Sequence, residues 1–290
     1  MRTAKIIECP RDALQGLGRF VSTHQKIAWI NQLLKVGFDT LDFGSFVSPK
    51  AIPQMKDTVE VLEGLELEDS SSKLLAIVAN TRGALEAGKF PQIHYLGFPL
   101  SLSETFQLRN TNKSIEKAKS EMYEIHEICM KKEKDLVVYL SMGFGNPYED
   151  AYHPDMVQGF VADLVSNGIS IISFADTVGI AGPKDIKDVI TPNISQFSNV
   201  EFGVHLHSRP ENCMEKLLAA YEAGCRRFDG VVNGAGGCPM AIDELVGNTP
   251  TELIIRLLEN HNHPLKIDKG ALAKSKELAI PIFEIDNNCH

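Results

Sequence analysis

The chain has 290 residues, of which 43% are apolar and 23% are charged, and its 29 basic and 38 acidic residues give a net charge of −9. These proportions exclude a disordered chain, a collagen-like repeat and a disulfide-rich miniprotein. Nucleic-acid binding is not expected, because phosphate contacts need clustered Lys and Arg, and the densest basic run covers only residues 131–134.

Short apolar segments alternate along the chain with longer amphipathic ones. We predict strands at residues 5–9, 40–46, 74–79, 93–100, 136–142, 170–175, 201–207 and 227–233. These segments lack strict polar alternation, which is typical of strands that are covered on both faces. Helices are predicted between them at residues 22–35, 114–131, 154–166, 183–190 and 211–222, and several end at a glycine, namely Gly37, Gly88, Gly168 and Gly224.

Eight repeats of a strand followed by a helix predict a (β/α)8 barrel, the TIM-barrel fold. An open doubly wound sheet is the alternative, but about six strands would be usual there and no Gly-x-Gly-x-x-Gly motif follows the first strand. We predict one barrel domain over residues 1–260. Residues 261–290 then form a C-terminal extension, whose predicted helix at residues 269–278 packs on the outside of the barrel.

The sequence also bears on location. No apolar run approaches the roughly 18 residues of a membrane span, and the first apolar run, Ile6-Ile7, ends at Glu8. We therefore expect no signal peptide and no membrane association. The six cysteines include no Cys-x-x-Cys pair, which favours free thiols and a cytoplasmic protein.

In a (β/α)8 barrel, chemistry takes place where the strands end and the following loops begin. His205 and His207 end the seventh strand, and residues i and i+2 of a strand point to the same face, so both imidazoles can bind one ion. Asp12, after the first strand, adds an anionic ligand. Two histidines packed in the upper barrel layer are the structural alternative. The nitrogen and oxygen ligands suit Mg²⁺, Mn²⁺, Co²⁺ or Zn²⁺ in a catalytic site with open positions.

Other polar residues at the predicted strand ends are candidates for catalysis. Arg11 forms either a surface ion pair or, as its position favours, a group that stabilises an oxyanion or enolate. Asp42 is either an acid/base or a group that orients Arg11 or a metal-bound water. Cys238 lies among glycines, a context that favours a functional thiol over a buried filler. Further polar residues at these positions are Ser45, Asn80, Ser173, Asp176, Thr177 and Asn248.

Several motifs occur together in one order. They are Arg11-Asp12-Ala13-Leu14-Gln15, residues 45–50 (SFVSPK) with Pro53-Gln54-Met55, Asp176-Thr177-Val178-Gly179, His205-x-His207 and Gly236-Gly237-Cys238-Pro239. Over residues 5–260 the chain thus resembles the hydroxymethylglutaryl-CoA lyase family, within the wider group of metal-dependent aldolase-like barrels. The SFVSPK and PQM segments are the most specific part of this resemblance.

The resemblance implies cleavage of 3-hydroxy-3-methylglutaryl-CoA, or a closely related 3-hydroxyacyl-CoA, into acetyl-CoA and acetoacetate. Arg11 would stabilise the enolate, and Cys238 would transfer a proton. By the family pattern, the divalent cation, usually Mg²⁺ or Mn²⁺, would be bound by Asp12, His205, His207 and Asn248. The substrate pocket would be lined by Ser45, Ser173, Asp176 and Thr177, and we expect Gln15 and Asn80 to join them. A homodimer is the default expectation for the assembly.

The chain departs from the family pattern near this pocket, which leaves the acyl group open. The family has Glu where Asp42 stands, and residues 208–212 (SRPEN) replace the usual Asp-Thr-Tyr-Gly-Gln. One alternative is a related aldolase or condensing acyltransferase with a different 2-oxo or 3-hydroxy acid, although such synthases usually carry a long C-terminal domain. A carboxyltransferase would need a lysine after strand five, where Ser141-Met142-Gly143 stands. A degenerate ligand-binding barrel would have a broken metal site.

Overall fold

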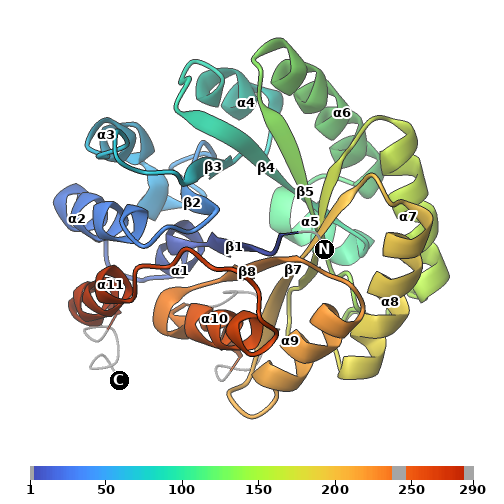
Figure 1. Ribbon diagram of the computed structural model, residues 1–290. Helices are drawn as coiled ribbons and strands as arrows, with labels where there is room; N and C mark the ends of the chain where they lie inside the picture. Colours follow the sequence, from blue (N-terminus) through green and yellow to red (C-terminus); the bar gives the residue numbers. More distant parts are fainter. Residues whose placement is uncertain (1–2, 237–245, 284–290) are drawn as a thin grey trace.

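Eight parallel strands form a closed barrel, which confirms the predicted fold (Figure 1). The computed structural model describes residues 3–236 and 246–283. Successive strands pair with one another, and the pairing of the first strand with the eighth closes the ring. The strands are β1 (Lys5–Glu8), β2 (Thr40–Ser45), β3 (Lys73–Ile77), β4 (Ile93–Ser101), β5 (Asp135–Ser141), β6 (Ile171–Asp176), β7 (Glu201–Ser208) and β8 (Arg227–Gly230).

Helices surround the barrel and cover its outer surface (Figure 1). Within the described ranges, none of them is both long and apolar enough to span a membrane. The helices are α1 (Pro10–Gln15), α2 (Thr23–Leu34), α3 (Thr58–Glu63), α4 (Thr81–Ala87), α5 (Glu104–Thr111), α6 (Ile115–Lys131), α7 (Pro154–Ser166), α8 (Pro183–Gln196), α9 (Cys213–Glu222), α10 (Thr251–Asn260) and α11 (Lys269–Phe283), with short 3₁₀ helices η1 (Pro53–Met55) and η2 (Val232–Gly234).

Local sequence signals account for several helix ends. The Ser22 hydroxyl accepts a hydrogen bond from the backbone N–H of Gln25, whose side chain accepts one from the backbone N–H of Ser22, so α2 begins with a capping box. The Ser114 side chain caps α6. Three of the predicted helix-ending glycines have a positive φ, the left-handed conformation that glycine adopts without steric cost; they are Gly37, Gly168 and Gly224.

The barrel interior is apolar on one side and charged on the other. Strands β3 to β6 contribute a separate buried cluster of Leu75, Ile77, Tyr95, Val137, Tyr139 and Ile171. Strands β1, β7 and β8 instead carry ion pairs, in which Glu201 contacts Lys5 at 2.6 Å and Arg227 at 2.9 Å. The charged part of the interior therefore includes β7, the strand that carries both predicted histidine ligands.

Several boundaries differ from the prediction. Residues 10–15 form α1, which was not among the predicted helices, because Pro10 occupies the first helical position, where its missing N–H and fixed φ are favourable. The eighth strand ends at Gly230, since η2 follows and Asn233 within it has a φ of 62°. The helix predicted at residues 183–190 continues as α8 to Gln196. An additional short strand, β9 (Gly247–Asn248), was not predicted and pairs antiparallel with β7.

The C-terminal helix α11 packs against α2 on the outside of the barrel (Figure 1). Trp29 is fully buried, and its indole N–H donates to the carbonyl of Ser275 at 3.1 Å. Its ring also makes an edge contact with Phe283, with centroids 5.5 Å apart. The helix predicted at residues 269–278 thus extends to Phe283, because its last turn continues to bury apolar surface.

We expect Gly37→Ala to lower the free energy of unfolding by about 1–3 kcal/mol. Gly37 has a φ of 89°, and a Cβ there would collide with the carbonyl oxygen of Lys266. Urea-induced unfolding measures the change. Gly18→Ala is the matched control, because Gly18 is exposed and a Cβ there meets no atom within 4 Å. Equal stabilities of the two variants would contradict the prediction.

Candidate functional site

Three predicted metal ligands meet at the carboxyl ends of β1 and β7. Asp12 lies in the first turn of α1, directly after β1, and His205 and His207 lie on β7. One ligand atom from each of the three side chains lies within 4.8 Å of the other two. The two imidazoles share a face because they are two residues apart on a strand. Barrel closure through β8 then brings Asp12 to the same place.

The short strand β9 brings Asn248 to this group. β9 runs antiparallel to β7, and Asn248 is the register partner of His207. The side-chain Nδ2 of Asn248 donates to the carbonyl of Ala235 at 3.0 Å. The amide nitrogen of Asn248 is therefore engaged with the backbone, and its amide oxygen is the atom that can bind a cation.

The protonation states and unpartnered atoms of this group suit a divalent cation. Asp12 Oδ2 and His207 Nδ1 are buried and have no hydrogen-bond partner among residues 3–236 and 246–283, although such atoms typically cost about 1–3 kcal/mol each. Burial opposes the charge on Asp12, but Arg11 and His205 outweigh it and lower the pKa of Asp12 to about 2. Burial and the neighbouring His205 lower the pKa of His207 to about 4. An ionised carboxylate and a neutral imidazole are the forms that bind metals.

Arg11 contacts the candidate ligands through a buried network. Its Nε lies 3.2 and 3.0 Å from the two carboxylate oxygens of Asp42, and its Nη2 also donates to Asp42. Its Nη1 donates to Asp12 and to Gln15, at 2.9 Å in each case. Gln15 in turn donates to Asp12 at 2.9 Å. These contacts, and not solvent, set the direction of the Arg11 guanidinium.

The contacts of Asp42 match one of its two expected roles, that of orienting Arg11. Its side chain is only 1% exposed, and both of its oxygens accept hydrogen bonds from Arg11. Burial raises the pKa of Asp42 to about 6 against the opposing charge of Arg11. Both oxygens of Asp42 therefore face Arg11, an arrangement that suits the orienting role better than proton transfer with a substrate.

Three of the predicted substrate-binding residues lie at or just after the ends of β1, β2 and β3. Gln15 belongs to the Arg11 network. The Ser45 hydroxyl donates to the carbonyl of Ile77 at 3.2 Å. Asn80 caps α4, where its side chain accepts a hydrogen bond from the N–H of Gly83 at 2.8 Å.

The other three predicted substrate-binding residues lie on β6 or just after it, and each is held by contacts within the protein. Asp176 forms a 2.9 Å ion pair with Lys216, and both side chains are 1% exposed. Thr177 accepts a hydrogen bond from the N–H of Met142 at 3.0 Å. Ser173 is fully buried within the strand. The carboxylate of Asp176 is therefore neutralised by Lys216 and is not brought into the group around Asp12. Cys238, the predicted proton donor, lies outside the described residues.

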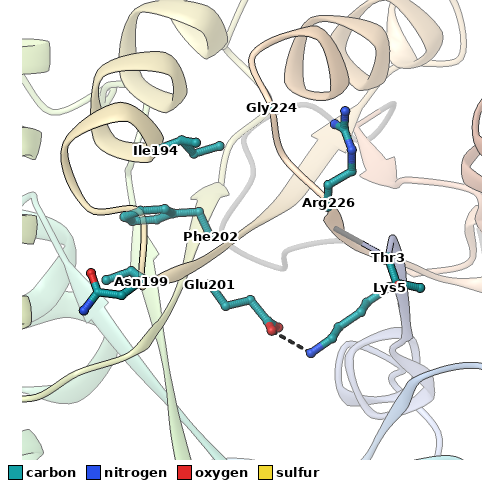
Figure 2. A pocket seen from close by; sticks show the side chains of 9 residues that line it. Thr3, Lys5, Ile194, Asn199, Glu201, Phe202, Gly224 and Arg226 are labelled. Carbon is teal, nitrogen blue, oxygen red and sulfur yellow. Dashed lines mark hydrogen bonds and ion pairs between the residues drawn. The ribbon is translucent and has the colours of Figure 1, made fainter. Parts of the chain in front are cut away.

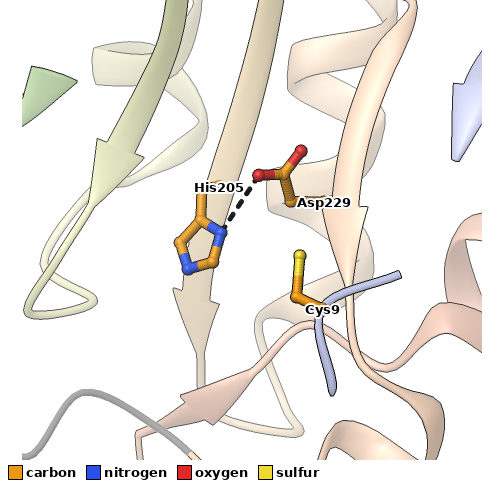
Figure 3. Close-up of side chains that lie close together, drawn as sticks. All are labelled: Cys9, His205 and Asp229. Carbon is orange, nitrogen blue, oxygen red and sulfur yellow. Dashed lines mark hydrogen bonds and ion pairs between the residues drawn. The ribbon is translucent and has the colours of Figure 1, made fainter. Parts of the chain in front are cut away.

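Two buried charged residues near the site were missed by the sequence analysis. Lys216 donates to the carbonyls of Gly179 and His207, at 2.9 and 3.1 Å, and so joins the end of β7 to the loop after β6. Asp229 lies on β8, with its Oδ2 3.2 Å from His205 Nδ1 (Figure 3). Two charged residues, Arg227 and Asp229, at i and i+2 of a predicted barrel strand were the available signal for Asp229, whereas the amphipathic pattern of α9 offered none for Lys216.

A pocket of about 330 Å³ lies at the opposite end of the barrel (Figure 2). It is lined by residues at the amino ends of the strands, including Lys5, Glu201 and Arg226. Lys5 and Glu201 are paired with each other at 2.6 Å. Because active sites of (β/α)8 barrels lie at the carboxyl ends of the strands, the candidate site is the group around Asp12 and not this pocket.

Comparison with known proteins identifies relatives over almost the whole chain. The HMGL-like family matches residues 5–279. A hydroxymethylglutaryl-CoA lyase of Bacillus subtilis is 34% identical over 253 residues, which cover 86% of this chain and 83% of that protein. The mitochondrial hydroxymethylglutaryl-CoA lyase of Homo sapiens is 31% identical over 261 residues, which cover 89% of this chain and 79% of that protein.

Solved structures of hydroxymethylglutaryl-CoA lyases also match this chain in fold. An HMG-CoA lyase from Acinetobacter baumannii, in complex with coenzyme A and 3-methylmalate, has a TM-score of 0.88 and 33% identity, and the match covers 97% of this chain and 90% of that chain. The HMG-CoA lyase from Brucella melitensis has a TM-score of 0.90 and 27% identity, and the match covers 98% of this chain and 100% of that chain. By sequence and by fold, this chain belongs to the HMGL-like family, the family of the hydroxymethylglutaryl-CoA lyases that it resembles.

Proposed function

We propose that this chain is a divalent-metal-dependent carbon–carbon lyase that cleaves 3-hydroxy-3-methylglutaryl-CoA, or a closely related 3-hydroxyacyl-CoA, into acetyl-CoA and acetoacetate. The observation that carries the proposal is that Asp12 accepts a hydrogen bond from a fixed guanidinium and also has a carboxylate oxygen within 4.8 Å of two imidazoles. A lyase of this kind needs a cation to bind the substrate oxygens and a second positive group for the enolate. Family membership supports the same reaction.

In this proposal the cation is bound by Asp12, His205, His207 and Asn248. Mixed nitrogen and oxygen ligands fit Mg²⁺ or Mn²⁺, and also Zn²⁺ or Co²⁺. When bound, such an ion polarises the hydroxyl and a carbonyl or carboxylate oxygen of the substrate. His207 is buried and its low pKa keeps it neutral at physiological pH, so protons do not compete with the metal for this ligand.

Arg11 is proposed to stabilise the thioester oxygen as it becomes negative. A base removes the hydroxyl proton, the carbon–carbon bond breaks to give the ketone, and its electron pair forms the enolate of acetyl-CoA. Because Asp42 and Gln15 orient Arg11 before substrate binds, little reorganisation is needed in the transition state. The enolate carbon then takes a proton, for which Cys238 is the proposed donor.

The proposed substrate is a coenzyme A thioester. The relative from Acinetobacter baumannii was solved with coenzyme A and 3-methylmalate, and it shares 33% of its residues with this chain. Gln15, Ser45 and Asn80 are proposed to contact the substrate. Ser173 and Thr177 are proposed to shape the floor and wall of the site. For Asp176 we propose an indirect role, in which its ion pair with Lys216 fixes the loop after β6.

We also propose that residues 1–260 form the catalytic barrel and that residues 261–290 are an extension packed on it. The buried contact of Trp29 with Ser275 supports this division, because it joins α11 to the outer layer of the barrel and not to the site.

With Mg²⁺ or Mn²⁺, we expect the native chain to release acetyl-CoA from 3-hydroxy-3-methylglutaryl-CoA. Arg11→Met should lower kcat by about 10²–10³-fold, the typical effect of removing one oxyanion-stabilising group, without loss of bound metal. Arg82→Met is the matched control, since it makes the same change at an exposed position of α4 and should leave turnover unchanged. Absence of turnover with every 3-hydroxy-3-alkylglutaryl-CoA tested would contradict the proposal.

Mn²⁺ should stabilise the native chain against thermal unfolding, by about 2.7 kcal/mol at a concentration 100-fold above its Kd.

Asp12→Asn should weaken Mn²⁺ binding at least about tenfold, because it removes the anionic ligand. Isothermal titration calorimetry measures the affinity. Asp155→Asn, at an exposed acidic residue of α7, is the control and should bind Mn²⁺ as the native chain does. Equal affinities of the two variants would place the metal elsewhere.

A further inference from the structure

His205 directs its two ring nitrogens toward different neighbours. Nδ1 lies 3.2 Å from Asp229 Oδ2, and Nε2 lies 3.9 Å from Asp12 Oδ2 (Figure 3 shows the Asp229 side). We propose that Asp229 is a positioning residue, which accepts the Nδ1 proton of His205 and thereby presents the Nε2 lone pair to the cation. This inference rests on the proposed function and assigns a role to a residue outside the set of four proposed metal ligands.

The number of protons on the imidazole ring fixes which nitrogen can bind a metal. A neutral imidazole has one N–H and one lone pair. A carboxylate can only accept a hydrogen bond, so contact with Asp229 places the proton on Nδ1. The lone pair of His205 is then on Nε2, the nitrogen that lies on the side of Asp12. With the proton on Nε2 instead, the lone pair would point away from the other candidate ligands.

The position of Asp229 is set by the barrel itself and not by a loop. Asp229 is in register with His205 across β7 and β8, and with Ile7 across β1 and β8. Its side chain is fully buried. The ring of Tyr139 meets the ring of His205 edge-on, with centroids 6.1 Å apart. The imidazole is therefore confined by Asp229 and by Tyr139.

The charge of Asp229 also has a source of compensation within the barrel. Arg227 is two residues earlier on β8, so the two side chains lie on the same face of the strand. Arg227 is fully buried, and its Nη1 donates to Glu201 at 2.9 Å. Asp229 Oδ1 and the Nε and Nη2 of Arg227 have no hydrogen-bond partner among the described residues. A buried guanidinium on the same face of β8 therefore lies close to the carboxylate of Asp229.

The same region offers a competing hypothesis, a second metal site. Ligand atoms of Cys9, His205 and Asp229 also lie within 4.8 Å of one another (Figure 3). A metal there would need the Nδ1 lone pair, but Nδ1 is the nitrogen that is hydrogen-bonded to Asp229. The thiol of Cys9 donates to the carbonyl of Ile7 at 3.6 Å, whereas metals bind the thiolate. The hydrogen bond of Nδ1 and the protonated thiol of Cys9 both favour Asp229 as a residue that positions His205, with one metal per chain and no second metal site.

The first test is spectroscopic and needs neither metal nor substrate. The full chain is labelled with ¹⁵N-histidine, and long-range ¹H–¹⁵N spectra are recorded at rising pH until the His205 ring carries a single proton, because Asp229 and Asp12 outweigh burial and raise the pKa of His205. Signals of His205 are assigned by their loss in His205→Gln. We expect a proton on Nδ1 and a bare Nε2. A proton on Nε2 of His205 would overturn the inference and leave the proposed reaction unaffected.

The second test is Mn²⁺ affinity, measured by calorimetry on the full chain. Asp229→Asn keeps the shape of the side chain but removes its charge, and the amide can donate to Nδ1 and reverse the tautomer. We expect binding about 10–100-fold weaker, the usual effect of losing a group that orients a metal ligand. Asp155→Asn is the matched control, because it makes the same change at an exposed position of α7 and should change the Kd less than about twofold.

The outcomes separate the two proposals. Native-like affinity in Asp229→Asn would overturn the inference alone, as would a stoichiometry of two Mn²⁺ per chain. If the native chain bound no Mn²⁺, the proposed metal function would fail and the inference would fail with it. Melting of the metal-free variants in the presence of EDTA shows whether each is folded. The tautomer of the native chain decides the inference even if Asp229→Asn does not fold.

Discussion

Closure of the barrel through β8 is the constraint on which the candidate site depends. β8 pairs with β1 on one side and β7 on the other, and Asp229 is the register partner of both Ile7 and His205. Only this closure brings Asp12, near the start of the chain, to two histidines near residue 205. His205, His207 and Asn248 lie on paired strands, and Asp12 lies in the helix that directly follows β1, so the positions of the ligands follow from the register of the sheet.

The second constraint is charge inside a buried site. The site contains three carboxylates, Asp12, Asp42 and Asp229. The guanidinium of Arg11 is in direct contact with two of them, Asp12 and Asp42. An unpaired buried charge is costly, so each carboxylate needs a partner. Asp42 pairs with Arg11 and Asp229 pairs with His205. Within the described part of the chain, Asp12 accepts hydrogen bonds on Oδ1, from Arg11 among others, and none on Oδ2. The remaining oxygen of Asp12, beside a neutral His207, is where a divalent cation would complete the balance.

Much of this arrangement could be predicted from the sequence, and the exceptions have physical causes. The alternation of apolar and amphipathic segments predicted all eight barrel strands, because strands buried on both faces and amphipathic helices differ in periodicity. The two-residue spacing of His205 and His207 predicted their shared face. The contact of Asp176 with Lys216 was not predictable, since a substrate-binding carboxylate and one neutralised by a distant lysine look the same in a sequence. Asn248 depends on β9, a two-residue strand without a periodic signal.

The sequence by itself determined the barrel, the end of the barrel at which the polar residues gather, and the resemblance to the lyase family, because these depend on local periodicity and on short motifs. The tertiary structure decided which of those polar residues are partnered with one another. Arg11 with Asp42, Asp229 with His205, and Asn248 opposite His207 are contacts between segments far apart in the chain. Their pairing follows from barrel closure and strand register, which local sequence does not encode residue by residue.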